Sequence, residues 1–141
     1  MRASILLQFS IVSVLLSSGC SNESTTPAPE SDTVEIADVV TEIVDLRDQI
    51  RDGFANGDVD AAHGPLHDVG DRLETLSAVA GQSGLSAEDK DAVEDCVNTL
   101  FAAFGEVDKT LHGQEGSTYE EEAATIDETL EKLDSLCKTH E

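Results

Sequence analysis

The chain has 141 residues, with 30 acidic side chains against eight Lys and Arg, a formal net charge of −22 and 39% hydrophobic residues. This length allows one domain, and the apolar fraction is high enough to form a core, which excludes a wholly disordered chain. The negative charge excludes an electrostatic contact with nucleic acid or anionic lipid headgroups, and it favours cationic partners or divalent ions.

The first nineteen residues are typical of a signal peptide. A short positive start is followed by an apolar stretch over residues 5–16, which is too short for a permanent transmembrane helix. The segment 16–20 (LSSGC) then resembles the lipobox of bacterial lipoproteins, and this resemblance implies that residues 1–19 are removed and that Cys20 is lipidated. The small residues Ser17 and Gly19 also fit an ordinary signal peptidase, which would leave a secreted or periplasmic protein.

The segment after Cys20 predicts where the protein is held. Ser21 follows the cysteine, as in lipoproteins sorted to the outer membrane, so we expect an outer-membrane lipoprotein that faces the periplasm. Residues 20–31 hold two of the three prolines and show no apolar periodicity, which indicates a flexible tether. The chain is similar to small acidic lipoproteins of planctomycete-type bacteria, and the resemblance implies membrane contact through the lipid anchor only.

From residue 32 onward the apolar residues follow a helical period. Four stripes of similar length alternate steps of three and four residues, over 36–50, 59–80, 93–111 and 119–137. The breaks at 53–57, 81–84 and 113–116 are rich in glycine. We therefore predict an all-α domain over residues 32–141, folded as an up-down-up-down antiparallel four-helix bundle.

Helix starts can be predicted from capping residues. Asp58 fits the N-cap of the second helix. Ser86 with Asp89 and Ser117 with Glu120 fit capping boxes that open the third and fourth helices.

The register of the bundle follows from the residue numbers. When two antiparallel helices pack side by side, the residue numbers of any two residues at the same level add up to the same value. This rule assigns the residues of the four stripes to shared layers. The predicted layers are Ile36/Leu76/Val97/Leu133, Val39/Leu73/Leu100/Leu130, Ile43/Val69/Phe104/Ile126, Leu46/Leu66/Val107/Ala123 and Ile50/Ala62/Leu111/Tyr119.

The residues beside the stripes predict contacts between the helices. In this register Glu42 faces Arg72, and Phe101 lies over Gly70. Arg47 lies opposite Glu120 or Asp127 in the same arrangement.

Two cysteines remain after lipidation. In an oxidising compartment such a pair is usually a disulfide, so we expect Cys96 to be joined to Cys137, with two buried thiols as the alternative. Cys137 also begins the segment 137–140 (CKTH), which faintly resembles the haem-attachment site of the cytochrome c-prime family, itself a family of four-helix bundles. The family's second cysteine and its histidine spacing are missing, so we expect no covalent haem.

Three histidines are the only candidate ligand-binding residues. His63, His67 and His112 fall at one end of the predicted bundle with Asp108 one turn away, and we expect His63 and Asp108 to face each other. Imidazoles on neighbouring helices can bind zinc or copper. The alternative is that these histidines are boundary or solvated residues, because all three lie well off the centres of their stripes.

The sequence contains no nucleophile elbow, phosphate loop or paired-carboxylate cleft. We therefore expect no enzymatic activity and no cofactor. The main interpretation is a non-enzymatic binding or structural module of the cell envelope, and the alternative is a periplasmic metal-binding protein.

Overall fold

The computed structural model describes residues 30–138, with side chains from residue 36 onward. The predicted signal peptide (1–19), the lipidation site Cys20 and residues 20–29 of the predicted tether lie outside the described residues. So does His140 of the segment that resembles a haem-attachment site.

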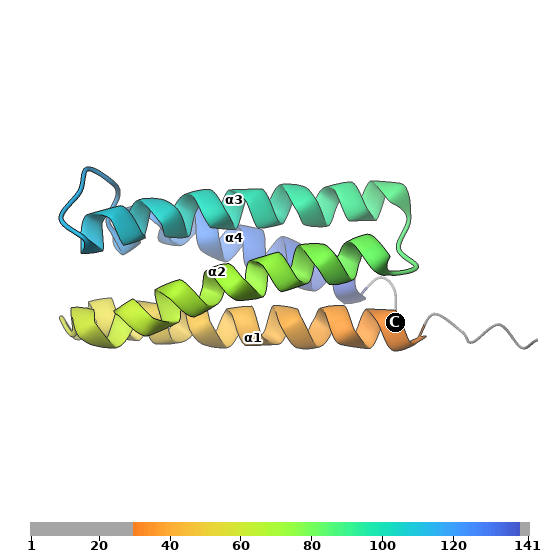
Figure 1. Cartoon of the computed structure of the whole chain (residues 1–141), viewed down its shortest axis with the longest axis horizontal. Helices are drawn as coiled ribbons and strands as arrows, with labels where there is room; N and C mark the ends of the chain where they lie inside the picture. Colours follow the sequence, from red (N-terminus) through yellow and green to blue (C-terminus); the bar gives the residue numbers. More distant parts are fainter. Residues whose placement is uncertain (1–29, 139–141) are drawn as a thin grey trace, which may run out of the picture.

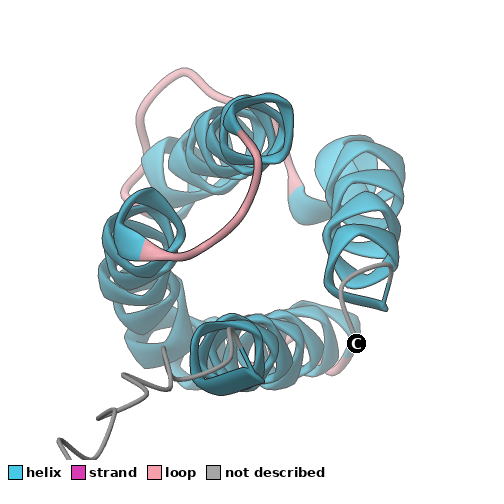
Figure 2. Cartoon of the chain, turned by 90° about the vertical axis from the view of Figure 1, so that its right-hand side faces the viewer, coloured by secondary structure: helices cyan, strands magenta, loops and turns pink. Residues whose placement is uncertain are grey.

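The fold is the predicted all-α four-helix bundle. The described residues form four helices and no strand: α1 (Glu30–Ala55), α2 (Val59–Gln82), α3 (Ala87–Leu111) and α4 (Tyr119–Lys138). Each helix packs against the next in the chain, and α4 closes the ring against α1 (Figures 1 and 2). The α1–α2 interface is the most extensive of the four and the α1–α4 interface the smallest. None of these helices is both long and apolar enough to cross a membrane.

The core confirms the predicted layers. Three layers are buried on all four helices: Ile36/Leu76/Val97/Leu133, Val39/Leu73/Leu100/Leu130 and Ile43/Val69/Phe104/Ile126. In the other two layers, Leu46, Leu111 and Ala123 are half-buried and the remaining members are buried. The apolar stripe of each helix therefore points to one shared core.

The predicted contacts between helices are also present. Glu42 and Arg72 form an ion pair across α1 and α2 with 3.2 Å between Oε2 and Nε. Arg47 of α1 pairs with Asp127 of α4. A Cβ added at Gly70 would lie 3.8 Å from the ring of Phe101.

Helix ends differ from prediction in two places. α1 begins at Glu30, two residues inside the predicted tether, which is within the usual ambiguity of helix ends. The cap of α4 is Thr118 with Glu121, not Ser117 with Glu120: Thr118 N–H donates to Glu121 Oε2 at 2.8 Å and Glu121 N–H donates to Thr118 Oγ1 at 3.4 Å. Asp58 and Ser86 cap α2 and α3 as predicted, each accepting a backbone N–H at 3.1 Å.

The predicted disulfide is wrong in this structure. Cys96 and Cys137 are both thiols, with Cys96 buried and Cys137 half-buried. Burial raises the pKa of the Cys96 thiol, while Lys132 of α4 lies close enough to the thiol to lower it. Val97 shares a layer with Leu133, so Cys137 lies about three residues, or about 4.5 Å along the helix axis, beyond the level of Cys96, and the two sulfurs are not bonded.

Candidate metal centre

α2 presents two histidines on one face. The Asp58 cap starts the helix, and the helix continues through Pro65, so His63 and His67 are both helical residues. Residues four apart in a helix lie one above the other on the same face. Accordingly the two Nε2 atoms are 3.0 Å apart, and the ring centroids are 4.8 Å apart.

The third histidine comes from the end of α3. His112 is the C-cap of that helix, held by its backbone N–H, which donates to the Asp108 carbonyl at 3.0 Å. Because α2 and α3 are antiparallel neighbours, the end of α3 lies beside the start of α2. The His112 ring centroid is 5.1 Å from that of His63 and 6.2 Å from that of His67.

The three imidazoles converge closely enough to share one metal ion. One nitrogen of each ring lies within 4.8 Å of the others. In a tetrahedral zinc site with Zn–N bonds of 2.0–2.1 Å, two ligand nitrogens are about 3.3 Å apart. The Nε2 atoms of His63 and His67, 3.0 Å apart in a hydrogen bond, are close to this spacing, and a three-nitrogen site requires the His112 nitrogen to move closer to them.

Asp108 occupies a supporting position. Its Oδ1 lies 3.4 Å from Nε2 of His112, and the group of ligand atoms within 4.8 Å contains the three histidines without Asp108. His63 itself contacts the rings of the other two histidines. A carboxylate beside a ligand imidazole orients the ring and raises its basicity.

The surroundings favour a cation. His63 is half-buried, and His67 and His112 are exposed, so an ion can reach the site directly from solvent. The chain's net charge of −22 adds a negative field at that surface.

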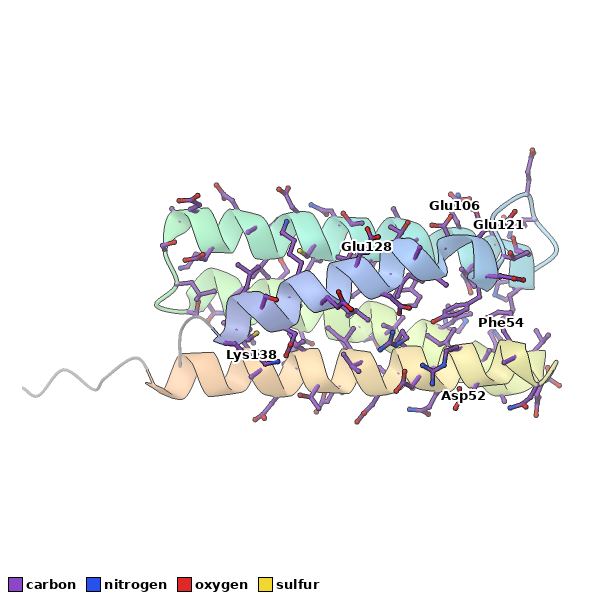
Figure 3. All side chains as sticks on the ribbon, turned by 180° about the vertical axis from the view of Figure 1, so that it is seen from behind. Asp52, Phe54, Glu106, Glu121, Glu128 and Lys138 are labelled. Carbon is purple, nitrogen blue, oxygen red and sulfur yellow. The ribbon has the colours of Figure 1, made fainter. Side chains whose placement is uncertain are left out.

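The same end of the bundle carries an aromatic pair on its opposite side. Phe54 of α1 and Tyr119 of α4 stack with ring centroids 5.8 Å apart, and Figure 3 places Phe54 near the start of α4. Burial raises the pKa of the Tyr119 hydroxyl, and the charge of Arg47 opposes this rise. Tyr119 therefore acts as a core residue that closes the last layer.

The buried Cys96 is poorly placed for thiolate chemistry. Burial raises the pKa of the Cys96 thiol, although Lys132 acts in the opposite direction. A thiol with a raised pKa is a weak nucleophile and a weak metal ligand, because both roles need the thiolate.

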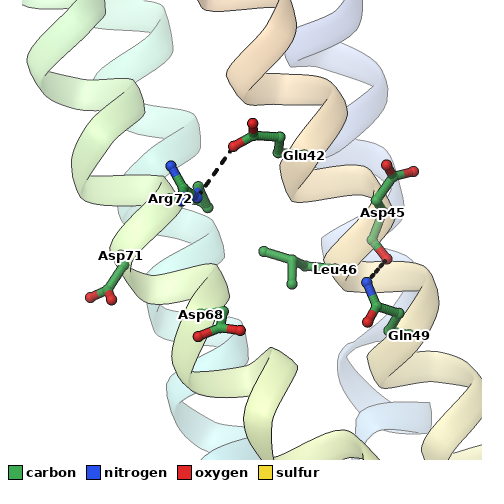
Figure 4. Close-up of a pocket in the computed structure, with 7 residues that line it drawn as sticks. All are labelled: Glu42, Asp45, Leu46, Gln49, Asp68, Asp71 and Arg72. Carbon is green, nitrogen blue, oxygen red and sulfur yellow. Dashed lines mark hydrogen bonds and ion pairs between the residues drawn. The ribbon is translucent and has the colours of Figure 1, made fainter.

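A second candidate surface is an acidic groove that was not predicted from the sequence. A groove of about 390 Å³ between α1 and α2 is lined by four carboxylates, Glu42, Asp45, Asp68 and Asp71, and by Arg72 (Figure 4). Its residues are spread along two helices, and Arg72 neutralises Glu42. The pairing across α1 and α2 was predicted, but the hollow depends on side-chain packing, which residue spacing does not give.

Comparison with protein-family models, with curated proteins and with solved structures finds no match to this chain.

Proposed function

We propose that this protein is an exported metal-binding protein of the cell envelope, whose bundle binds a divalent transition-metal ion, zinc or copper, at His63, His67 and His112. The proposal depends on one observation: three imidazoles from two helices offer nitrogens within 4.8 Å of one another. Imidazole nitrogen is a preferred ligand of both ions.

A binding role agrees with the exposure of the site better than a catalytic one. Catalytic metal ions lie in shaped cavities, where the protein controls the access of water. His67 and His112 are exposed on the bundle surface. We therefore propose capture, storage or delivery of the ion without enzymatic turnover.

The proposed location depends on the sequence of residues 1–31. The signal-like segment, the lipobox-like residues ending in Cys20 and the proline-containing tether support a bundle held near a membrane by lipid. An acidic domain on such a tether would be repelled from anionic lipid, which leaves its histidines accessible to ions in the periplasm.

Zinc titration by calorimetry tests the metal site. The wild-type protein should bind one Zn²⁺ with a dissociation constant far below the millimolar range. Each of His63→Ala, His67→Ala and His112→Ala should weaken binding by at least about 10-fold, because each removes a ligand. Asp108→Asn should have a smaller effect, since it removes only the group that orients His112.

The fourth histidine of the chain provides a matched control. His140 follows Lys138 by two residues, and Lys138 lies at the opposite end of the bundle from Phe54 (Figure 3). His140→Ala should therefore leave zinc affinity unchanged. Millimolar binding in the wild type, or equal losses in His140→Ala and His67→Ala, would reject the proposed site.

Fractionation of cells tests the proposed location. The wild-type protein should be found in the outer-membrane fraction, whereas Cys20→Ser should give an exported, soluble protein, because stable anchoring needs more than one acyl chain. A wild-type protein found soluble in the cytoplasm would contradict both export and lipidation.

A further inference from the structure

A small apolar pocket opens directly beside the three histidines. It lies between α2 and α3, with a volume of about 190 Å³. Its floor is core: Leu66, Val69, Leu73 and Phe104 are all buried. Its polar end is formed by His67 and Asp108, so one ligand residue of the metal site is also a wall of the pocket.

Two glycines create this space. Gly70 of α2 and Gly105 of α3 both line the pocket, where larger residues would fill the gap between the helices. A Cβ added at Gly105 would meet nothing within 4 Å, so neither packing nor backbone conformation requires a glycine there. A glycine inside a helix lowers stability by about 1 kcal/mol relative to alanine. A residue larger than glycine at position 105 could therefore extend toward the pocket without a clash at its Cβ.

The outer edge of the pocket is an exposed aromatic ring. Phe101 is 38% exposed, one of the two exposed large hydrophobic residues among the described residues, and it lies over Gly70. An apolar cavity of about 150 Å³ holds a benzene molecule in other proteins. A pocket of about 190 Å³ with an aromatic edge is thus large enough for one six-membered ring.

The polar end of the pocket has unused bonding capacity. Asp108 Oδ1 is shielded from solvent and makes no hydrogen bond, although it lies 3.4 Å from His112 Nε2. Three histidines also leave one position of a tetrahedral metal ion for a further ligand. A neutral donor is favoured at this position over an anion, because the chain carries a net charge of −22.

We propose that the α2–α3 pocket binds a small aromatic compound with one six-membered ring that carries a neutral nitrogen donor group. The ring occupies the apolar pocket, and the nitrogen coordinates the metal ion held by His63, His67 and His112. This inference rests on the proposed metal-binding function for the coordination of the nitrogen, while binding of the ring depends on the pocket alone.

The first experiment tests the pocket without metal. Toluene is titrated into zinc-free protein while the methyl NMR signals of Leu66, Val69 and Leu73 are followed. These signals should shift in the wild type and stay unchanged in Gly105→Leu, whose side chain fills the pocket. If the leucine variant fails to fold, Gly105→Ala takes its place in the experiment. It adds only one methyl group and should reduce the shifts without abolishing them.

The second experiment tests the joint site on zinc-loaded protein. 4-Phenylimidazole should bind at least about 10-fold more tightly than imidazole, since burying a ring removes apolar surface from water. Gly105→Leu should lower this ratio at least fivefold. Gly81→Leu is the matched control, because Gly81 is a helical glycine with nothing within 4 Å of an added Cβ, and it does not line the pocket.

The outcomes separate the two proposals. Absence of toluene shifts in the wild type, or a phenyl-to-imidazole ratio near one, would overturn the pocket proposal. Failure of zinc to bind while toluene still shifts the methyl signals would reject the metal-binding function and the joint ligand class, and would leave an apolar pocket only.

Discussion

The two faces of α2 carry two different grooves. On the α1 side, four carboxylates surround a hollow of about 390 Å³, and on the α3 side three histidines border an apolar pocket of about 190 Å³. The acidic groove carries more charge, but its groups are spread out and one of them is paired with Arg72. The histidine groove carries little charge, but its nitrogens converge within 4.8 Å. The difference shows that convergence of donor atoms, more than charge, distinguishes a candidate metal site.

The largest expected effect concerns the floors of the two grooves. Leu73 is fully buried under the α3 side of α2, whereas Leu46 on the α1 side is only half-buried. Leu73→Ala should lower the free energy of unfolding by about 2–5 kcal/mol, and Leu46→Ala should lower it by less. Urea denaturation measures both. Equal losses would show that the two floors are packed alike.

The next effect separates the grooves by metal linkage. Zn²⁺ at 100 times its dissociation constant should raise the free energy of unfolding by about 2.7 kcal/mol, because the ion binds only the folded protein. Asp68→Asn combined with Asp71→Asn should retain this gain, and His67→Ala should lower it to about 1.4 kcal/mol or less at the same zinc concentration. Loss of the gain in the asparagine variant would place the ion in the acidic groove instead.

The N-cap of α2 is expected to affect both the stability of the bundle and zinc binding in the histidine groove. Asp58→Ala removes the side chain that accepts the Ala61 N–H at 3.1 Å, and it should cost about 1 kcal/mol of stability. Fraying of the first turn should also weaken zinc binding several-fold through His63. Ser86→Ala removes the equivalent cap of α3, far from the site, and should cost a similar amount without changing zinc affinity. Equal zinc affinities in the two variants would disprove the link.

The smallest effect belongs to the ion pair of the acidic groove. Glu42 and Arg72 are about half exposed, so Arg72→Ala should change the free energy of unfolding by no more than roughly 1 kcal/mol. The change should shrink further at high salt, because screening weakens exposed pairs. A larger, salt-independent loss would mean that Arg72 acts through packing.

The bundle itself could be predicted because the apolar residues that form its core repeat with a helical period along the chain. Apolar stripes set the faces of the helices, and the residue numbering set the layers. Once the flanks were chosen, Glu42 fell opposite Arg72, and Asp127 was one of two predicted partners of Arg47. The cap of α4 was displaced by one residue because Ser117 and Thr118 are both capable caps, and the helix starts only at Tyr119. Sequence alone does not choose between them.

The candidate site was predictable in part. The antiparallel topology placed His63, His67 and His112 together, but the role of Asp108 depends on side-chain geometry at the end of α3. The pocket at Gly70 and Gly105 was missed, although the contact of Phe101 with Gly70 was expected. Facing glycines on two neighbouring helices are the signal that would have identified it. The disulfide was wrong because it was predicted from the usual pairing of cysteines in an oxidising compartment, which does not determine whether two side chains meet.

The small α1–α4 interface has a consequence for the order in which the bundle assembles. The other three interfaces join helices that are adjacent in the chain and separated by short turns, so their contacts form between residues close in sequence. Such contacts form quickly, whereas the contact of the first helix with the last must close a loop of nearly the whole domain. Docking of α1 against α4 should therefore be the last folding step. Backbone amides along this interface should accordingly exchange with solvent deuterium sooner than those between α1 and α2.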